Sequence, residues 1–218
     1  MSLTNDLQAH AERSTAAASA ETVAQRSEAR EKLAALTQTR PVIAVGDVAP
    51  DFSLPDAAGS SVHLSELLTT GPVVVSFYRG GWCPYCNIEL RALQAALPAL
   101  TAAGATLVAI SPDAPDDSLS TAEKSDLQFP VLSDTRAAAI TAYGLNYTIE
   151  SVSRAVLSDE EAERADARGV ETQVLPTPAT YVIGTDGRVA YAFVDHDYTH
   201  RAEPTEIVAA VSALTSGA

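Results

Sequence analysis

The chain has 218 residues, which is enough for one domain that buries a core without disulfides or metal ions. Its 28 acidic and 14 basic residues give a net charge of −14 at pH 7, and this charge argues against binding to nucleic acid or to anionic lipid surfaces. No segment reaches the ~18 apolar residues of a membrane helix, and the N-terminal residues lack the apolar stretch of a secretory signal. We therefore expect a soluble, cytoplasmic protein with no nucleic-acid or membrane partner.

The first 40 residues are predicted to form an N-terminal helical arm, and residues 41–218 a single domain. Residues 1–38 are rich in Ala, Glu, Gln and Arg and contain no Gly or Pro, which predicts one helix ending before Pro41. Its apolar positions are sparse. That pattern favours either a helix laid on the surface of its own domain or an arm that contacts a second subunit and makes the protein a homodimer.

The first half of the domain has the pattern of a βαβ unit. Residues 72–78 form a continuous β-branched run, as in a strand buried on both faces. Leucines at helical spacing in 87–103 predict a helix that Gly104 ends, and 106–110 reads as a second buried strand. Strand, helix and strand in this order predict parallel pairing with a right-handed crossover.

The other expected elements complete an α/β fold. Asp186-Gly187, between the alternating runs 179–183 and 188–193, is the strongest hairpin signal in the chain. Residues 146–174 are acidic and resemble an insertion, and the acidic loop 111–117 is interpreted as solvated. The remaining elements are two short strands around Gly59, helices near 118–125 and 135–143, a strand at 129–132, a helix over 159–168, a hairpin of 179–183 with 188–193, and a final helix at 204–214.

Two cysteines, Cys83 and Cys86, form one C-x-x-C motif and are the only cysteines in the chain. A single pair excludes both a disulfide framework and a four-cysteine zinc site. Cys83 follows a buried strand and opens a helix, where backbone N–H groups and the helix dipole favour a thiolate, and Arg79 can add positive charge. Cys86 lies one turn deeper, within reach of a disulfide. The spacing predicts an exposed, nucleophilic Cys83 and a resolving Cys86.

Other candidate residues have more than one interpretation. Trp82 either packs in the core or, as favoured here, flanks the Cys83 sulfur and shapes the substrate entrance. Arg201 either reaches the active site or caps the following helix. The segment Asp195 to His200 contains two histidines and two carboxylates, but a polar loop is favoured over a metal site because no further ligand cluster is evident. His10 and His63 are interpreted as surface residues.

The residues around the cysteines resemble a known family. Trp82-Cys83-Pro84-x-Cys86 resembles the active site of the thioredoxin superfamily, and Thr177-Pro178 resembles its cis-proline site, whose loop faces the cysteines. Other motifs are similar to the alkyl hydroperoxide reductase / thiol-specific antioxidant (AhpC/TSA) family and its peroxiredoxin-like branch, over about residues 41–214. These motifs are Pro50-Asp51-Phe52-x-Leu54, Leu64-Ser65-Glu66-Leu67, Ser133-Asp134, Tyr143-Gly144, Leu175-Pro176-x-Pro178, the block 77–86 and the block 197–204.

The resemblance implies a thioredoxin-like fold, with helices on both faces of a central mixed sheet, behind the N-terminal extension. It also implies a thiol-dependent peroxidase. Cys83 would attack hydrogen peroxide or an organic hydroperoxide, Cys86 would close a Cys83–Cys86 disulfide, and thioredoxin or a similar dithiol would reduce it, with no metal or organic cofactor. Substrate-binding roles would fall to Arg79, Gly80, Gly81, Trp82, Thr177, Pro178 and Arg201.

Two positions depart from the family pattern. Typical members carry proline seven residues before the reactive cysteine and threonine three before it, whereas this chain has Ser76 and Gly80.

The Trp-Cys-Pro-x-Cys motif by itself fits equally well a general thiol–disulfide oxidoreductase that acts on protein disulfides. A non-enzymatic redox-sensing module is the third alternative.

Overall fold

A five-stranded mixed sheet forms the centre of the molecule. The structure is a computed structural model, and it describes residues 2–148 and 174–215. The strand order is β5-β4-β3-β8-β9, in which β3 is parallel to β4, β4 is parallel to β5, and the β3–β8 and β8–β9 pairs are antiparallel. The strands are β3 (Val73–Phe77), β4 (Thr106–Ser111), β5 (Val131–Ser133), β8 (Ala179–Ile183) and β9 (Val189–Val194). The predicted α/β architecture is confirmed.

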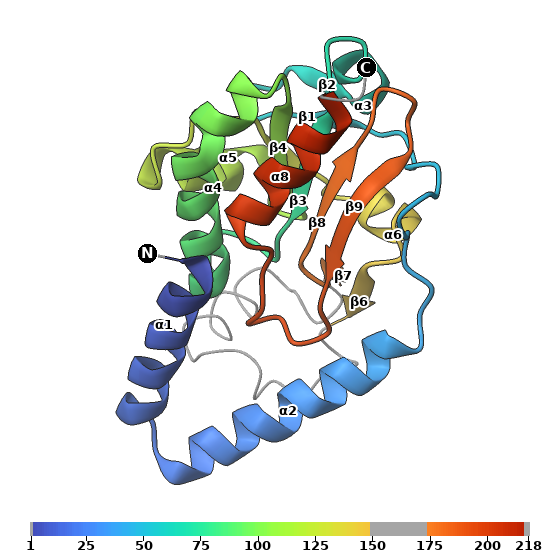
Figure 1. Cartoon of the computed structure of the whole chain (residues 1–218). Helices are drawn as coiled ribbons and strands as arrows, with labels where there is room; N and C mark the ends of the chain where they lie inside the picture. The colour runs from blue at the N-terminus through green and yellow to red at the C-terminus, as the bar shows by residue number, and fades with distance from the viewer. Residues whose placement is uncertain (1, 149–173, 216–218) are drawn as a thin grey trace.

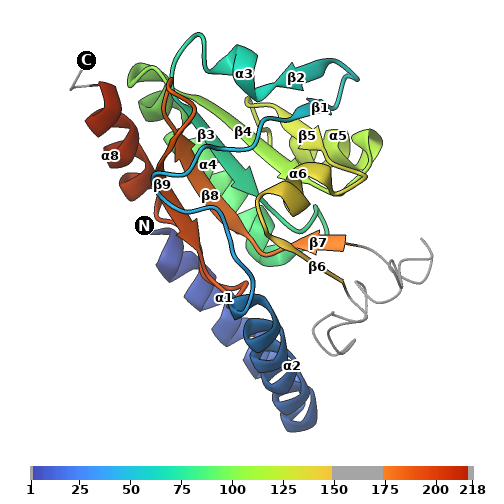
Figure 2. The same cartoon turned by 90° about the vertical axis from the view of Figure 1, so that its right-hand side faces the viewer.

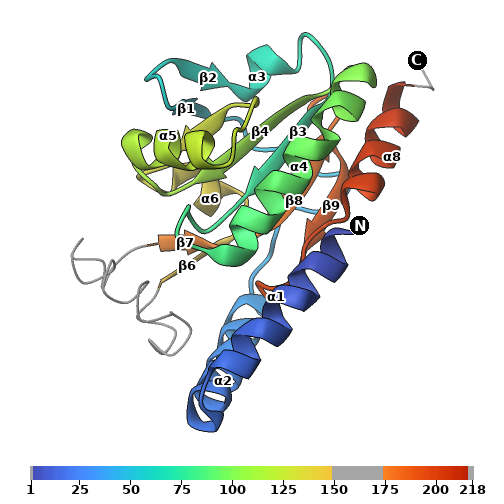
Figure 3. The same ribbon diagram turned by 90° about the vertical axis from the view of Figure 1, so that its left-hand side faces the viewer.

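Helices cover both faces of this sheet (Figure 1). One face packs against α4 (Pro84–Ala102), α5 (Pro115–Lys124) and α8 (Pro204–Thr215), and Figure 3 shows α4 lying across it. The other face packs against α6 (Ala138–Ala142), α3 (Leu64–Leu67) and the β1–β2 ribbon, and Figure 2 shows α6 in front of the sheet with α4 behind it. The ribbon pairs β1 (Ser53–Pro55) with β2 (Ser61–His63). Two apolar cores, one on each face, therefore hold the sheet.

The predicted βαβ unit is confirmed as β3, α4 and β4. Every residue of β3 is buried, which agrees with its continuous apolar sequence. Gly104 follows α4 with a φ of +84°, a conformation that glycine adopts without strain, and it turns the chain into β4. The β8–β9 hairpin around 184–187 is confirmed as well. Because β3 is the middle strand, the loop that follows it lies at the centre of the sheet, at the C-terminal end of β3.

The prediction of a single N-terminal helix is wrong. The arm consists of α1 (Leu3–Ala17) and α2 (Ala20–Gln38), which diverge from a turn at one end of the molecule (Figure 1). Ala18 is extended, and the Ser19 hydroxyl accepts a hydrogen bond from the backbone N–H of Thr22 at 3.1 Å. A serine in this position caps a new helix, so the Ala- and Ser-rich stretch contains a break that composition does not reveal.

The arm is laid on its own domain. Leu3 and Leu7 of α1 are buried where that helix packs against α4, and the Glu203 carboxylate accepts the backbone N–H groups of Leu3 and Thr4. Ala29 and Leu33 of α2 are buried in an apolar cluster with residues of the domain. These contacts agree with the first of the two interpretations of the arm. The cluster joins Ala29, Leu33, Tyr147, Leu175 and Tyr198, with Leu36, Trp82 and Tyr85 against it.

Residues 146–174 begin and end in paired strands. Strand β6 (Asn146–Thr148) pairs antiparallel with β7 (Val174–Pro176), so the two ends of this segment lie side by side. This pairing agrees with the interpretation of the segment as an insertion. The helix expected over 159–168 lies outside the described residues.

A cis peptide before Pro178 is not found, and that prediction is wrong. No cis peptide occurs within residues 2–148 and 174–215. The Thr177 backbone N–H donates to the Leu145 carbonyl at 2.8 Å, which continues the β6–β7 pairing by one residue. The chain then passes directly into β8, and a trans bond keeps it extended between the two strands.

None of the helices in the described ranges is long and apolar enough to cross a membrane.

Candidate active site

The site is built on the loop that joins β3 to α4. Cys83 is the N-cap residue of α4, and Pro84 occupies the first helical turn, where its missing N–H is not needed. The Cys83 N–H donates to the Gly80 carbonyl at 3.1 Å, and Asn87 Nδ2 donates to the Gly81 carbonyl at 2.9 Å. Gly80 and Gly81 are therefore tied to the first turn of α4, and the predicted position of Cys83 at a helix N-terminus is confirmed.

Gly80 has a conformation and an environment that exclude a larger residue. Its φ is +142°, and a Cβ atom there would lie 2.4 Å from Trp82 Nε1 and 2.8 Å from Trp82 Cδ1. A threonine at this position would have to displace the indole and adopt a backbone conformation that L-residues rarely adopt. The departure from the family pattern thus has a physical reason, because the Trp82 side chain occupies the space beside Gly80.

The Gly81 N–H is bound by the protein itself. It donates to Asp113 Oδ2 at 2.9 Å, and a Cβ on Gly81 would lie 2.1 Å from Thr121 Oγ1. Asp113 is only 3% exposed. The interpretation of 111–117 as a solvated loop is therefore wrong for this residue, which anchors the active-site loop. Because Asp113 takes the Gly81 donor, that N–H is not available to a substrate.

Cys83 is buried, which contradicts the expectation of an exposed sulfur. Its exposed fraction is 1%. The sulfur borders a cavity of about 120 Å³ that lies between the arm and the domain. The arm closes one side of the cavity, because residues of α1 and α2 line it together with Cys83. The lining residues are His10, Ala11, Ser14, Thr15, Val23, Arg26, Arg30, Arg79, Cys83, Pro84, Tyr85 and Tyr198.

Arg79 lies inside the site, as its sequence position allowed. It is 2% exposed, and its guanidinium carbon lies 4.7 Å from the centre of the Trp82 ring and 4.4 Å from that of Tyr198. Stacking between two aromatic faces holds the cation in place. Trp82 is half-buried and packs against the same apolar cluster as both cysteines, as expected for a residue that flanks the sulfur. The site therefore has a fixed positive charge beside Cys83.

Two tyrosines complete the cavity wall. Tyr85 contacts His10 edge-to-face at 4.8 Å and Tyr198 at 5.9 Å between ring centres. Burial raises the pKa of Tyr198 to about 12, and it raises the pKa of Tyr85 as well. Both phenols keep their protons at neutral pH, so each can donate a hydrogen bond into the cavity. His10 is half-buried here, and its interpretation as a surface residue is wrong.

Cys86 lies in a different environment, enclosed in the core beneath Cys83. Burial raises the pKa of its thiol well above the ordinary value, and a hydrogen bond with Cys83 raises it further. Arg201 Nη2 lies 3.5 Å from the Cys86 sulfur, and Arg201 Nε donates to Glu89 Oε2 at 2.6 Å. Of the two roles considered for Arg201, reaching the active site is therefore the one that the structure shows.

The Arg201–Glu89 ion pair is almost wholly buried. Both side chains are 1% exposed. Arg201 also donates to the carbonyl oxygens of Tyr198 and His200. Burial raises the pKa of Glu89 to about 7, against the attraction of the guanidinium. For Arg201, burial alone would lower the pKa, but the charges of Glu89 and the two cysteines raise it above its usual range. The guanidinium therefore remains charged beside Cys86.

Thr177 and Pro178 lie at the same end of the central strands as the active-site loop. Ala179, the first residue of β8, pairs with Phe77, the last residue of β3. Thr177 is 5% exposed, and its N–H is used by Leu145. Their placement follows from the strand register, and their roles in substrate binding remain predictions.

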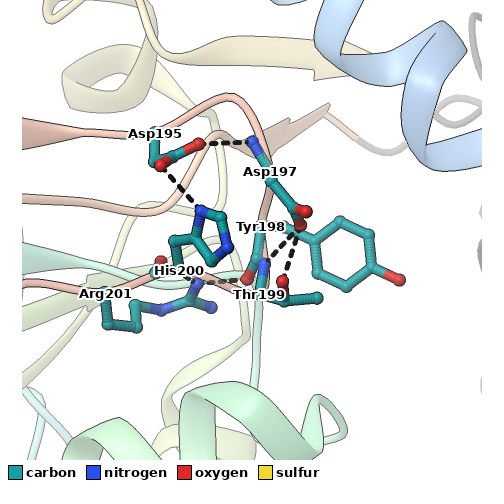
Figure 4. A network of polar contacts seen from close by, with 6 residues as sticks. All are labelled: Asp195, Asp197, Tyr198, Thr199, His200 and Arg201. Carbon is teal, nitrogen blue, oxygen red and sulfur yellow. Dashed lines mark hydrogen bonds and ion pairs between the residues drawn. The ribbon is translucent and has the colours of Figure 1, made fainter. Parts of the chain in front are cut away.

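The loop after β9 is a network of polar contacts (Figure 4). Asp195 accepts from the Asp197 N–H at 2.8 Å and pairs with His200 at 2.9 Å, while Asp197 Oδ1 accepts from the backbone N–H and hydroxyl of Thr199. His196 Nδ1 lies 2.9 Å from the Thr37 hydroxyl of α2. These contacts hold Tyr198 and Arg201 in position. In the parts of the chain that the structure describes, no group of three His, Cys, Asp or Glu residues could hold a metal ion.

Sequence reasoning missed the contribution of the arm and of the aromatic wall. His10, Arg26 and Arg30 come from a segment outside the family motifs, and nothing local in the sequence links them to Cys83. The proximity of Tyr198 to Arg79 likewise depends on the loop after β9. A periodicity search could find the buried face of α2, but it could not show which surface that face covers.

Comparison with known proteins agrees with this geometry. The solved structure of peroxidoxin BcpB from Mycobacterium tuberculosis superposes with a TM-score of 0.62 at 25% identity, covering 79% of this chain and 98% of that one. Peroxiredoxin Q of Xanthomonas campestris superposes with a TM-score of 0.59 at 19% identity, covering 80% and 98%, and supports the fold alone. A central mixed sheet with paired cysteines at a helix N-terminus defines a thioredoxin-like thiol protein.

The family follows from the sequence match. The model of the AhpC/TSA family matches residues 45–192, so the chain belongs to that family. Peroxiredoxin Bcp of Escherichia coli is 38% identical over 89 residues, which are 41% of this chain and 56% of that protein. A Mycobacterium tuberculosis protein named putative peroxiredoxin is 37% identical over 99 residues, 45% of this chain and 62% of that protein. The matched segments thus span less than two thirds of these relatives.

Proposed function

We propose that the protein is a thiol peroxidase that reduces hydrogen peroxide or an organic hydroperoxide at Cys83. The observation that carries the proposal is the asymmetry of the cysteine pair, because Cys83 lines the cavity beside the arm and Cys86 is not among the described residues of that lining. The positive end of α4 and the Arg79 guanidinium stabilise a thiolate at Cys83. Membership of the AhpC/TSA family supports the same chemistry.

The first step is a displacement on oxygen. The Cys83 thiolate attacks the outer oxygen of the peroxide, an S–O bond forms, and the O–O bond breaks. The sulfur is oxidised to sulfenic acid, and the departing alkoxide or hydroxide takes up a proton and leaves as alcohol or water. Arg79, Tyr85 and Tyr198 are donor-bearing residues of the domain that line the cavity together with Cys83. They take the part that the threonine hydroxyl plays in typical members, since Gly80 has none.

The second step forms a disulfide. The Cys86 sulfur attacks the Cys83 sulfenic acid, an S–S bond forms and water leaves. Cys86 is held as a thiol by burial, and Arg201 at 3.5 Å stabilises the thiolate that develops during the attack. An external dithiol, thioredoxin or a similar protein, then reduces the disulfide by exchange and restores both thiols. This cycle needs no metal or organic cofactor, and a thioredoxin partner fits a cytoplasmic location.

The test is a stopped-flow measurement with fully reduced protein and hydrogen peroxide. The fluorescence of the single tryptophan, Trp82, reports oxidation of the adjacent Cys83. We expect a rate orders of magnitude above that of free cysteine at the same pH. Cys83→Ser should abolish peroxide consumption, and Cys86→Ser should complete one turnover and then accumulate sulfenic acid, detected by dimedone labelling and mass spectrometry. A wild-type rate near that of free cysteine contradicts the proposal.

A general thiol–disulfide oxidoreductase is the second candidate, and the hydrogen bond between the two sulfurs within one helical turn favours it. The arm and the small volume of the cavity argue against a protein disulfide reaching Cys83. Reduction of insulin disulfides in the same preparation separates the two functions. Turnover of insulin without fast oxidation by peroxide would favour the second.

A further inference from the structure

We propose that the N-terminal arm makes the Cys83 cavity selective for small anions, so that its preferred substrate is a hydroperoxide that carries a carboxylate. The selecting residues are Arg26 and Arg30 of α2. The substrate class rests on the proposed peroxidase function, whereas the anion preference of the cavity can be measured without it.

The cavity is shared between the arm and the domain. Residues of α1 and α2 line it together with residues of the β3–α4 loop, the first turn of α4 and Tyr198. Figures 1 and 3 show the arm helices at the end of the molecule where α4 begins. Arg26 and Arg30 come from the arm, and Arg79 comes from the loop beside Cys83. A ligand that reaches the sulfur therefore passes between groups contributed by segments that are far apart in the sequence.

The charge of this cavity is opposite to that of the whole chain. Acidic residues outnumber basic ones by 28 to 14, yet the described lining contains three arginines and no carboxylate. Ion pairs among the described residues involve neither Arg26 nor Arg30. Burial raises the pKa of Tyr85 most, Arg30 and Arg26 lower it, and the charges of Cys83 and Asp197 raise it, so both arginines act on the site although Asp197 lies near enough to oppose them. A concentration of arginines in the wall of a cavity on an acidic protein attracts small anions to this place.

Packing of the arm fixes the part of α2 that carries both arginines. Ala29 lies directly before Arg30 and is 1% exposed, and Leu33 on the next turn is 2% exposed. Arg26 Nη1 donates to the Ser14 hydroxyl of α1 at 3.3 Å, which ties the two arm helices together beside the cavity. The Arg26 side chain is therefore tied to α1, and Arg30 belongs to a turn of α2 whose apolar residues are packed against the domain.

The two parts of the proposed substrate meet different residues. Arg79 is stacked between Trp82 and Tyr198 next to the sulfur, where charge develops as the O–O bond breaks. Arg26 and Arg30 are the additional cations, and a guanidinium binds a carboxylate through parallel hydrogen bonds. The carboxylate takes no part in bond breaking. It positions the hydroperoxide. The reaction remains the displacement described above, and its product is the corresponding hydroxy acid. A cavity of about 120 Å³ fits a short hydroperoxide.

The first experiment compares two alkylating agents of similar size at Cys83, iodoacetate and neutral iodoacetamide. We expect the ratio of their rates at Cys83 to exceed the ratio for free cysteine by roughly tenfold, the size of one well-placed charge interaction. Added sodium chloride should lower the ratio, because salt screens the arginines. These wild-type measurements need no substitution that could disturb folding. A ratio equal to that of free cysteine contradicts the proposal.

The second experiment uses a charge-matched pair of variants. Arg26→Gln/Arg30→Gln should bring the ratio close to that of free cysteine. The control is Lys32→Gln/Arg91→Gln, which removes the same charge from exposed positions of α2 and α4 outside the cavity lining. The control should keep the wild-type ratio, and circular dichroism should show unchanged helix content in both. An equal fall in both variants contradicts the proposal.

The third experiment tests the substrate class with β-hydroperoxyisovalerate and its methyl ester. Wild-type Cys83 should be oxidised faster by the carboxylate, and Arg26→Gln/Arg30→Gln should remove this preference. Fast oxidation by both without preference contradicts the proposal and leaves the peroxidase intact. Slow oxidation by both, with the iodoacetate preference retained, contradicts the peroxidase and supports the anion site. An effect found only in reduction of the disulfide by thioglycolate, relative to its methyl ester, assigns the arginines to a reductant and contradicts the proposed substrate.

Discussion

The two cysteines lie three residues apart on one helix, yet their surroundings are opposite in kind. Cys83 borders a cavity with cations and phenols on its wall, whereas Cys86 is enclosed in the apolar core with one buried ion pair beside it. The exposed fraction is 1% for Cys83 and 0% for Cys86. Exposure therefore does not distinguish them, and what differs is whether space and positive charge adjoin the sulfur. The difference assigns attack on substrate to Cys83 and resolution to Cys86.

The largest expected effect concerns the ion pair on the Cys86 side. Arg201→Met leaves Glu89 buried without its partner, and we expect the free energy of unfolding to fall by about 3–5 kcal/mol. The double variant Glu89→Met/Arg201→Met should lose much less, because no buried charge is left unpaired. Urea unfolding of the reduced proteins measures both. A double variant at least as unstable as Arg201→Met would show that packing, and not charge pairing, stabilises this part of the core.

The next effect compares the two sulfurs directly. Near neutral pH we expect iodoacetamide to modify Cys83 in Cys86→Ser roughly a hundredfold faster than Cys86 in Cys83→Ser, because both thiolate fraction and access are lower for Cys86. Burial raises the pKa of Cys86, so its thiolate should form only above the ordinary range, and its alkylation should accelerate at more alkaline pH. Both cysteines should react equally in urea. Equal rates in the folded proteins would remove the proposed division of roles.

The smallest effect concerns the loop on the Cys83 side. Gly80→Ala should cost about 1–3 kcal/mol of unfolding free energy, because φ is +142° and the new Cβ meets Trp82. Gly59→Ala is the matched control, since it also has a positive φ, +84°, but no atom within 4 Å of the added Cβ. The control should cost less, at about 1 kcal/mol. Urea unfolding measures both, and Trp82 fluorescence should shift only in Gly80→Ala. Equal costs would show that the indole does not restrict this position.

The fold was predictable because its signals are local. The buried run of β3, the leucine spacing of α4, Gly104 and the Asp-Gly hairpin each depend on a few neighbouring residues, and all occur as expected. The break between α1 and α2 was missed because alanine and serine suit a helix as well as its cap. The trans bond before Pro178 was missed because the cis prediction was based on a resemblance of Thr177-Pro178 to another site, while the neighbouring β6–β7 pairing is indicated by no local pattern.

The sequence by itself determined the reactive element of this protein, a cysteine pair at the start of a helix behind a buried strand. Burial of an apolar strand and capping of a helix are decided by residues close in the chain. Only the tertiary structure decided what surrounds the sulfurs. The arm, the loop after β9 and α4 meet through contacts between distant residues, such as Arg201 with Glu89 and His10 with Tyr85. The charge, volume and closure of the cavity are properties of that meeting and of no single segment.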